Sequence, residues 1–345
     1  MLHYLPEGTE LTAKRFRDWG NLRYALRSVE SYADWINHVF IVTNGQVPSW
    51  LNTGYHKVSI VKHSDIFRNL SHLPTFNAQA IETHIHRIPG LSKSFLYMND
   101  DFFFAQTVEL EDFYSKETGF KIRFGAERVP EYIDKCNKLT EHLDDIEVVG
   151  TQCDNSDCEW DGQKCITAKQ STIALASRYG SFFGSLFYTS LTYYRAFGHA
   201  QRGVPAHAPY IIDIDVMNAL QDRFSEEWER TSKNRFRDPI CFQYSFAYYH
   251  FLIHSQQQNM CQGAGAQPIA TNLYHYTDYA YFATGNSTKL EKVLTSFLRK
   301  KNKKFVCLND HMGNKYSDAE IARNGDVIAK FFQEYFPERS KFEIN

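Results

Sequence analysis

The sequence predicts an α/β fold in which a mixed, mostly parallel sheet is flanked by helices. Short apolar segments typical of buried strands alternate with amphipathic helical segments through the first hundred residues. The 345 residues, 43% of them hydrophobic, are enough to enclose a large core. A net charge of −2 argues against a nucleic-acid partner, and no apolar run reaches the roughly 18 residues of a membrane span.

The first part of the domain, residues 1–130, begins with a helix and then alternates strand and helix. The predicted elements are a helix over 21–33, strands over 38–43 and 57–62, a helix over 77–87 and a strand over 95–98. Ligands bind beyond the carboxyl ends of parallel strands. We therefore expect Asn44-Gly45 and Asn99-Asp100-Asp101 to lie on one shared rim.

The rest of the chain divides into an insertion and the second part of the domain. Residues 131–168 are acidic, rich in cysteine and poor in apolar periodicity, which predicts a small insertion. Residues 169–345 complete the domain. The predicted elements there are helices over 211–220, 242–252, 288–299 and 319–336, and a strand over 305–308.

Two predicted strand ends carry the clearest chemical signal. Asp100 and Asp101 follow one apolar strand, and Asn309 and Asp310 follow another far downstream. If they converge, their oxygens are ligands of the kind that Mg²⁺ or Mn²⁺ prefers. Many nucleotide-sugar enzymes hold a cation against a diphosphate with such a strand end, which predicts a nucleotide-sugar-transferase-like fold. Two unrelated solvated turns are the alternative interpretation.

Four further side chains could take part in catalysis. His207 lies between two prolines, and this constrained backbone suits a positioned general base; a turn histidine without a role is the alternative. Arg235 and Arg237 could bind phosphate bidentately, or simply begin a solvated helix. Glu82 shares a helix face with His86, for which a solvated pair is the default explanation.

The cysteines and two glycosylation motifs favour a lumenal compartment. The clustered cysteines predict two disulfides, since no C-x-x-C pair supports zinc; they are Cys136, Cys153, Cys158 and Cys165. The aspartates among them are candidate calcium ligands. Asn69 and Asn286 each begin an N-x-S/T sequon.

Three long segments resemble conserved blocks of the Stealth proteins. The second block resembles the stretch from Asn21-Leu22-Arg23-Tyr24 to Asn99-Asp100-Asp101. The third resembles Val204-Pro205-Ala206-His207 through Arg237, and the fourth Lys304 through Asp310 with the final helix. The cysteine segment is similar to the end of a Lin-12/Notch repeat, as found in the animal branch. It has four cysteines instead of six, and Lys164 replaces an acidic ligand, which argues against calcium binding.

The resemblance implies transfer of N-acetylglucosamine-1-phosphate from UDP-N-acetylglucosamine to a mannose 6-hydroxyl on high-mannose glycans of lysosomal enzymes, with release of UMP. It implies a Golgi lumen location and a homo-oligomer, and it allows for an accessory subunit. The resemblance also implies roles for residues. Asp101 with Asn309 or Asp310 would hold Mg²⁺ or Mn²⁺, and Arg237 would neutralise phosphoryl oxygens. His207 or Glu82 would be the base, and the donor would be bound by Arg23, Asn44 and Asp100.

One departure from the family pattern keeps two alternatives open. The first Stealth block, with a Tyr-Thr-Trp-Val-(Asn/Asp)-Gly type motif, is not found ahead of the second. This block is expected to supply a strand and part of the nucleotide site. A non-catalytic recognition module is therefore one alternative. A bacterial-type transferase that adds hexose-1-phosphate to capsule is the other, although sequons and a Notch-like remnant have no place there.

Overall fold

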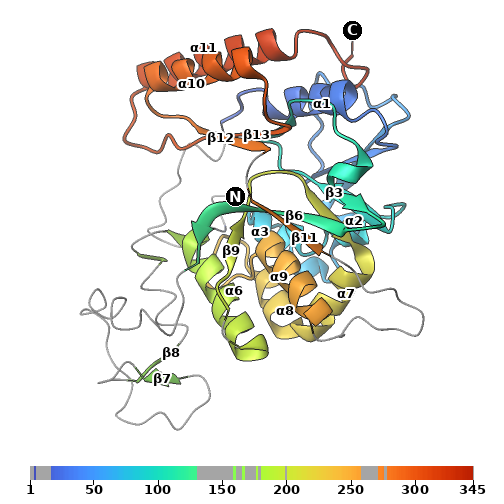
Figure 1. Ribbon diagram of the computed structural model, residues 1–345, viewed down its shortest axis with the longest axis vertical. Coiled ribbons are helices and arrows are strands. Elements are labelled where there is room, and N and C mark those ends of the chain that lie inside the picture. The colour runs from blue at the N-terminus through green and yellow to red at the C-terminus, as the bar shows by residue number, and fades with distance from the viewer. Residues whose placement is uncertain are drawn as a thin grey trace.

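The fold is a mixed α/β assembly of helices and several small sheets (Figure 1). The computed structural model describes residues 4, 17–129, 158–160, 165–167, 176–177, 180–198, 200–257, 271–275 and 278–344. Its α-helices are α1 (Asn21–Tyr32), α2 (His63–Ile66), α3 (Ala78–Glu82), α6 (Ser181–Phe197), α7 (Ile214–Arg223), α8 (Ser225–Lys233), α9 (Tyr244–Gln257), α10 (Ser287–Lys300) and α11 (Asp318–Tyr335). Short 3₁₀ turns cover Leu70–His72, Ile85–Arg87 and Leu110–Asp112.

The described strands pair in five small sheets. They are β1 (Val39–Thr43), β2 (Val58–Lys62), β3 (Ser94–Tyr97), β4 (Phe102–Phe104), β5 (Tyr114–Ser115), β6 (Gly119–Arg128), β7 (Cys158–Trp160), β8 (Cys165–Thr167), β9 (Gly203–Pro205), β10 (Tyr210–Asp213), β11 (Thr271–His275), β12 (Tyr279–Ala283) and β13 (Phe305–Asn309). The predicted α/β class is confirmed. The expected mostly parallel sheet is wrong for these strands, because only three of eight pairings are parallel: β1–β2, β6–β11 and β12–β13.

The pairing of β13 with β4 matters most for the site. The two strands are antiparallel, with Cys307 opposite Phe102 and Phe305 opposite Phe104. The ladder continues one step past β4, where the Leu308 amide donates to the Asp101 carbonyl at 3.0 Å. The two strand ends singled out from the sequence therefore lie side by side, although about two hundred positions separate them.

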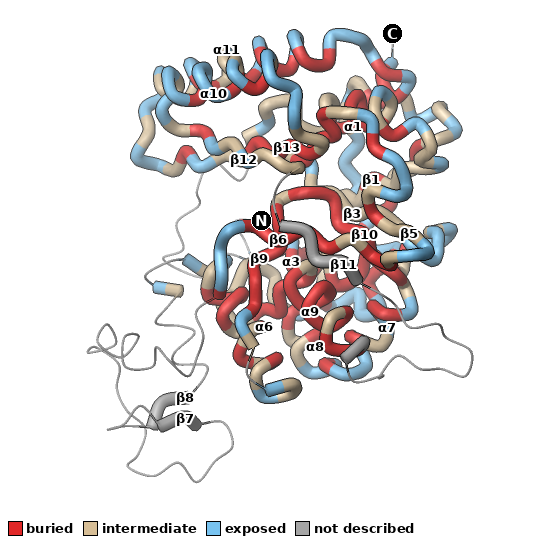
Figure 2. Tube along the Cα trace, viewed as in Figure 1, coloured by how far each residue is buried: buried red, intermediate tan, exposed pale blue. Residues whose placement is uncertain are grey.

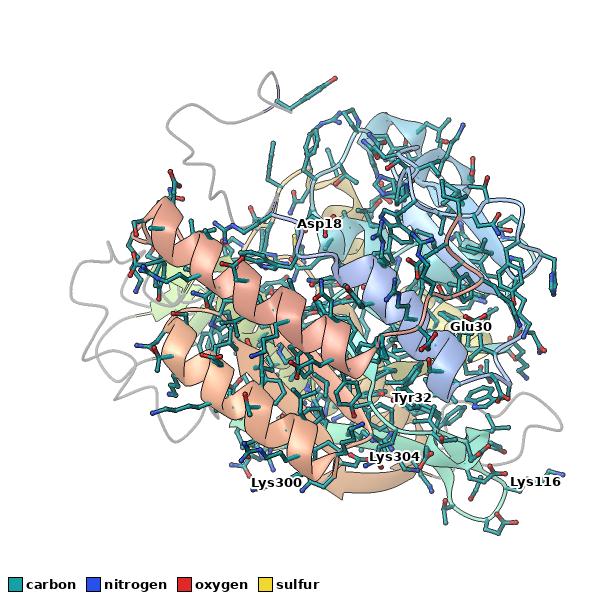
Figure 3. All side chains as sticks on the ribbon, turned by 90° about the horizontal axis from the view of Figure 1, so that it is seen from above. Asp18, Glu30, Tyr32, Lys116, Lys300 and Lys304 are labelled. Carbon is teal, nitrogen blue, oxygen red and sulfur yellow. The ribbon has the colours of Figure 1, made fainter. Side chains whose placement is uncertain are left out.

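Two hydrophobic clusters lie on either side of these strands. On one side, α10 and α11 lie beside each other over β12 and β13 (Figure 1), and Phe103 and Leu308 pack beneath them. Seen from above, α1 runs next to α11 (Figure 3), and Tyr24 stacks on Phe332 with ring centroids 4.4 Å apart. The larger cluster lies below, around β10 and α9, where the chain is almost continuously buried (Figure 2).

The helix predicted over 77–87 breaks after one turn. The Thr83 carbonyl would accept from the Arg87 amide in a continuing helix. It accepts instead from the Trp228 indole at 2.9 Å and from the Arg87 guanidinium at 3.2 Å. The Arg87 amide turns to the His84 carbonyl, giving a 3₁₀ turn. This tertiary hydrogen bond from Trp228 cannot be read from local spacing.

The helix predicted over 211–220 begins later than expected. Ile211 and Ile212 belong to β10, which pairs antiparallel with β3. Asp213 then caps α7, since its carboxylate accepts from the Asp215 and Val216 amides. The predicted helices over 21–33, 242–252, 288–299 and 319–336, and the strands over 38–43, 57–62, 95–98 and 305–308, are confirmed within one to five residues at their ends.

The insertion lies mostly outside the described residues. Cys136 and Cys153 are not described, and Cys158 and Cys165 are described only as members of the β7–β8 hairpin, in which Trp160 faces Cys165. The four-cysteine pairing therefore stays a prediction. Two other cysteines, Cys241 and Cys307, are buried free thiols. No helix in the described part of the chain is long and apolar enough to cross a bilayer.

Both sequon asparagines are exposed and cap helical turns. The Asn69 side chain accepts from the Ser71 amide, and Asn286 accepts from the Lys289 amide at the start of α10. Glycosylation at either position stays a prediction, as does the likeness to nucleotide-sugar transferases.

Candidate active site

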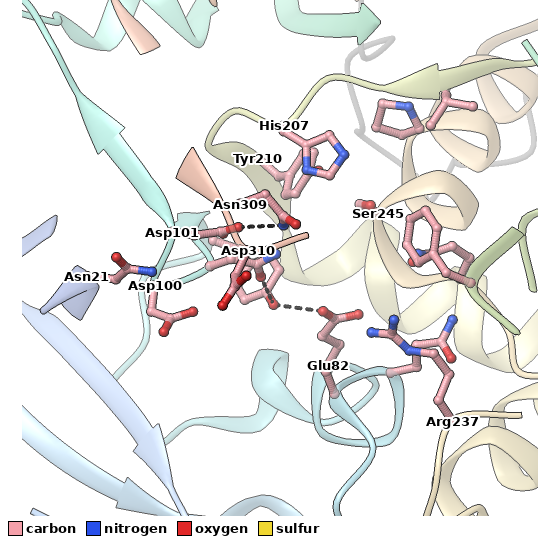
Figure 4. A pocket seen from close by; sticks show the side chains of 18 of the residues that line it. Asn21, Glu82, Asp100, Asp101, His207, Tyr210, Arg237, Ser245, Asn309 and Asp310 are labelled. Carbon is pink, nitrogen blue, oxygen red and sulfur yellow. Dashed lines mark hydrogen bonds between the residues drawn. The ribbon is translucent and has the colours of Figure 1, made fainter. Parts of the chain in front are cut away.

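A cavity of about 370 Å³ lies where both strand ends meet α3, α6, β9 and α9. Figure 4 shows Asp100, Asp101 and Asn309 gathered on one side, Glu82 and Arg237 on another, and His207 above them. The residues that line it come from eight segments: Arg17, Trp19, Asn21, Ala78, Gln79, Glu82, Tyr97, Asn99, Asp100, Asp101, Phe182, Leu186, Val204, Pro205, His207, Tyr210, Arg237, Gln243, Ser245, Asn309 and Asp310.

Asp101 is a carboxylate of this cavity with one oxygen that accepts no hydrogen bond. Its Oδ2 accepts from Asn309 Nδ2 at 2.9 Å and from Cys307 Sγ at 3.5 Å. Its Oδ1 is buried and has no hydrogen-bond partner. Burial raises the pKa of Asp101 to about 6, and the charge of Asp100 adds to this. A buried, unpaired carboxylate oxygen is costly, so this atom is suited to a cation.

Asp310 is the opposite case. Its Oδ1 accepts from the Thr284 hydroxyl at 3.0 Å and the Met312 amide at 2.8 Å. Its Oδ2 accepts from Arg17 and from the Trp19 indole at 3.2 Å. Both oxygens are therefore already used by protein donors, and Asp310 organises the wall of the cavity.

Asn21 and Asp100 complete the carboxylate side. Figure 4 shows the Asn21 side chain directed toward Asp100. The Asn21 Oδ1 is buried and has no partner, as for Asp101. Asp100 remains exposed, and desolvation beside the cavity is the main cause that raises its pKa. The hard oxygen ligands on this side are therefore the Asp101 Oδ1 and the Asp100 carboxylate, since Figure 4 shows the nitrogen end of the Asn21 side chain on the Asp100 side.

These residues fit a divalent cation, but only with help from a ligand. Among the described residues, no three His, Cys, Asp or Glu side chains are grouped closely enough to hold a metal ion. The expected convergence of Asp100, Asp101 and Asp310 into one ligand cluster is therefore not found, although all three line the cavity. Mg²⁺ is typically held by one or two carboxylates plus substrate phosphates, which this arrangement allows.

Glu82 is partly buried beside a tyrosine that has two acceptors. Tyr97 Oη lies 2.9 Å from Glu82 Oε1 and 2.6 Å from Asn99 Oδ1. One hydroxyl proton cannot serve both acceptors, so both contacts are met only when Glu82 carries a proton. Burial raises the pKa of Glu82, opposed by the Tyr97 hydrogen bond and the Arg237 charge. The two contacts of Tyr97 and the raised pKa both disfavour the charged form of Glu82.

His207 stands on a tight turn above the cavity. The Ala208 amide donates to the Ala206 carbonyl at 2.8 Å, which places His207 at the centre of a γ-turn. Its ring lies 4.9 Å from the Tyr281 ring and 6.1 Å from Phe102. Burial, then the charge of His311, lowers the pKa of His207 to about 4. The imidazole is thus neutral near pH 7 and able to accept a proton.

The two arginines of the third segment have different places. Arg237 lines the cavity, and its guanidinium lies 5.5 Å from the Phe182 ring centroid. Arg235 donates instead to the carbonyls of Pro74 at 2.7 Å and Ser71 at 3.1 Å, so it fixes the loop before α3. Arg237 is the one in position for a phosphate.

Arg23 and Asn44 do not line this cavity. β1 pairs only with β2 in the described sheets, so it does not share a hydrogen-bonded sheet with β3, and the expected shared rim stays a prediction. Asn44 is exposed in the turn after β1. Arg23 lies over the Trp50 ring at 5.0 Å and pairs with Glu343 at 3.6 Å.

Sequence reasoning missed several polar lining residues, including Arg17, Asn21, Gln79, Gln243 and Ser245. Arg17 precedes the helix predicted over 21–33, and Asn21 begins it. That helix was predicted from its apolar face alone. Gln79 lies three positions before Glu82, and this i, i+3 spacing on one helix face was an available signal.

Three family models match the chain in the order in which their conserved regions occur. Residues 15–122 match Stealth protein conserved region 2, residues 206–254 match conserved region 3, and residues 296–345 match conserved region 4. The chain belongs to the Stealth family. The resemblance inferred from sequence is confirmed at this level, and the matched regions include every polar residue on the carboxylate side of the cavity.

Named Stealth relatives include animal and bacterial proteins. The human N-acetylglucosamine-1-phosphotransferase subunits alpha/beta are 48% identical over 158 residues, 45% of this chain and 12% of that protein. An exopolysaccharide phosphotransferase of Streptomyces coelicolor is 27% identical over 96% of this chain and 46% of its own length. The receptor polysaccharide phosphotransferase WefC of Streptococcus oralis is 33% identical over 66% of this chain and 64% of its own. The chain thus spans less than two thirds of each relative.

Proposed function

We propose that this Stealth chain transfers a hexose 1-phosphate from a nucleotide sugar to a glycan hydroxyl. The proposed donor is UDP-N-acetylglucosamine and the proposed acceptor is the mannose 6-hydroxyl of lysosomal-enzyme glycans, with release of UMP. The observation that carries this proposal is the unpartnered Asp101 oxygen in a cavity that Arg237 and His207 also line. Relatives named as sugar phosphotransferases support the reaction class.

Asp101 would hold the cation. It presents Oδ1, and Asn309 orients the carboxylate through its hydrogen bond to Oδ2. A bound Mg²⁺ or Mn²⁺ would neutralise diphosphate charge and polarise the phosphoryl group. Asp310 serves by holding Arg17 and Trp19 in the wall. Asp100 would add negative charge that strengthens cation binding.

Arg237 and His207 would act on the reacting groups. The hydroxyl oxygen of the acceptor forms a bond to the β-phosphorus, and the bond from that phosphorus to the UMP oxygen breaks. Arg237 donates to the phosphoryl oxygens, which carry the developing charge. Neutral His207 takes the hydroxyl proton, since Glu82 is the group whose contacts favour its protonated form. Diphosphate charge nearby opposes the lowered pKa of His207, which makes it a better base.

The acceptor separates the animal-type function from the bacterial type. The 48% identity with the human protein favours the mannose acceptor, whereas the bacterial relatives cover more of the chain at lower identity. The exposed sequon asparagines support a Golgi lumen location. A homo-oligomer and an accessory subunit stay predictions.

The test has two parts, binding and transfer. Calorimetric titration with UDP-N-acetylglucosamine should give binding that Mg²⁺ strengthens. UMP release should then depend on α-methyl mannoside more than on a bacterial capsule fragment. Asp326→Asn, an exposed carboxylate on α11, is the matched control for Asp101→Asn. Absence of binding with and without Mg²⁺ would contradict the enzyme proposal and favour a recognition module.

A further inference from the structure

A third unpartnered oxygen lies in the cavity wall, at Gln79 on α3. Gln79 is only 1% exposed, and it lines the cavity one helical turn before Glu82. Its Nε2 donates to the Ser185 hydroxyl at 2.7 Å, which joins α3 to α6. Its Oε1 is buried and has no hydrogen-bond partner. No role for this residue could be predicted from the sequence.

The surrounding hydrogen bonds fix which end of the carboxamide is free. The Ser185 hydroxyl donates its single proton to the Phe182 carbonyl at 2.7 Å. The Ser185 oxygen must therefore accept from Gln79, and only the Nε2 end can donate to it. The backbone of Gln79 is fixed as well, because its amide donates to the capping Asn77 side chain at 3.2 Å. The unpartnered atom is thus an acceptor whose orientation is preset.

An amide oxygen can be satisfied only by a group that carries hydrogen. Phosphoryl oxygens only accept, so the diphosphate of a nucleotide sugar cannot pair with Gln79 Oε1. An N–H or O–H can, and a nucleotide sugar carries these on its nucleobase, its ribose and its hexose. Figure 4 places Glu82, which shares α3 with Gln79, on the Arg237 side of the cavity and across from Asp100.

We propose that Gln79 is a specificity residue whose carboxamide oxygen accepts a hydrogen bond from an N–H or O–H in the nucleoside or hexose part of the donor substrate. This inference rests on the proposed function, since it needs a nucleotide sugar in the cavity. A site built to pair with a substrate N–H or O–H rejects analogues that lack it far more strongly than a hydrophobic pocket rejects a missing methylene. Gln79 would therefore select among nucleotide sugars that share one diphosphate.

The experiment compares Gln79→Met with Ser185→Ala. Met keeps the length of the side chain and removes the acceptor. Ser185→Ala removes the same hydrogen bond between α3 and α6 but leaves Gln79 Oε1 in place, and Ser185 does not line the cavity. Affinities for UDP, UDP-glucose and UDP-N-acetylglucosamine are measured by calorimetry in Mg²⁺, with urea unfolding midpoints for each variant.

Gln79→Met should weaken at least one of these ligands roughly 10- to 100-fold, and Ser185→Ala about threefold or less. Weakening of all three ligands would assign the bond to the nucleoside. Weakening of both sugars alone would assign it to a hexose hydroxyl, and of UDP-N-acetylglucosamine alone to the acetamido N–H. Unchanged affinities, or equal losses in both variants, would overturn the inference.

Two outcomes separate this inference from the function on which it rests. If the wild-type chain binds none of the ligands, the proposed function fails and the inference fails with it. If the wild-type chain binds and Gln79→Met binds equally well, only the inference fails. Should Gln79→Met not fold, the wild-type chain is titrated with N3-methyl-UDP and with singly deoxygenated UDP-hexoses. Equal affinity for every such analogue would then overturn it.

Discussion

The two Asn-Asp strand ends have the same local sequence and opposite roles. After β3, Asp101 keeps one buried oxygen without a partner, and its neighbour Asp100 adds a second carboxylate. After β13, Asp310 uses both oxygens for four protein donors. Asn309 belongs to the first site through its bond to Asp101. A strand-end aspartate is therefore a candidate ligand only when the surrounding donors leave an oxygen unused.

The largest effect should come from Asp101→Asn. Loss of the unpartnered carboxylate should lower transfer by roughly 100-fold or more. Without a cation, the same variant should be about 2 kcal/mol more stable at pH 7.5, because it lacks a buried charge. Urea unfolding checks this. The stability that protonated Asp101 provides is present below about pH 4 and is lost as pH rises through about 6. The stability advantage of Asp101→Asn over the wild-type chain should therefore vanish near pH 4.

Asp310→Asn should destabilise the second strand end. The new amide N–H group would face protein donors that now donate to the carboxylate, and Arg17 would lose its charged partner. We expect a loss of about 2–4 kcal/mol in the free energy of unfolding. Transfer per folded molecule should fall less than in Asp101→Asn. A stable Asp310→Asn variant that binds no Mg²⁺ would instead make Asp310 a ligand.

Cation affinity should depend on pH through Asp101. Protons compete with Mg²⁺ for its carboxylate, whose pKa is raised to about 6 by burial. The affinity for Mg²⁺ should therefore fall about tenfold per pH unit below pH 6 and level off above it. Thermal shifts with Mg²⁺ at pH 5, 6 and 7.5 measure this. An unchanged shift at pH 5 would show that another group binds the ion.

Asn309→Leu should impair transfer less than Asp101→Asn does. The variant removes the hydrogen bond to Asp101 Oδ2 but leaves Oδ1 and the β4–β13 ladder in place. Since one neutral donor to a charged acceptor contributes about 1.5–3 kcal/mol, Mg²⁺ affinity should fall by roughly 10- to 100-fold. A loss of transfer as large as that of Asp101→Asn would place Asn309 on the ion itself.

The sequence predicted much of this cavity and missed what depends on long-range contacts. Periodicity placed α1, β3, β13 and α11, and the Asn-Asp motif found Asp101 and Asn309. It could not show that Asp310 is saturated, because its donors Arg17 and Thr284 are distant in sequence. Gln79 was missed because its free carboxamide oxygen follows only from the hydrogen bonds of Ser185, which donates to the Phe182 carbonyl and accepts from Gln79.

The β4–β13 ladder sets the spacing of the cation side by backbone geometry. Side chains such as Phe103 and Leu308 can be exchanged for others of similar volume while Asp101 and Asn309 keep their distance. A single inserted or deleted residue between Asp101 and Phe104 would slip the register and turn every later side chain to the opposite face. In evolution, these few positions can therefore accept substitutions but not insertions or deletions.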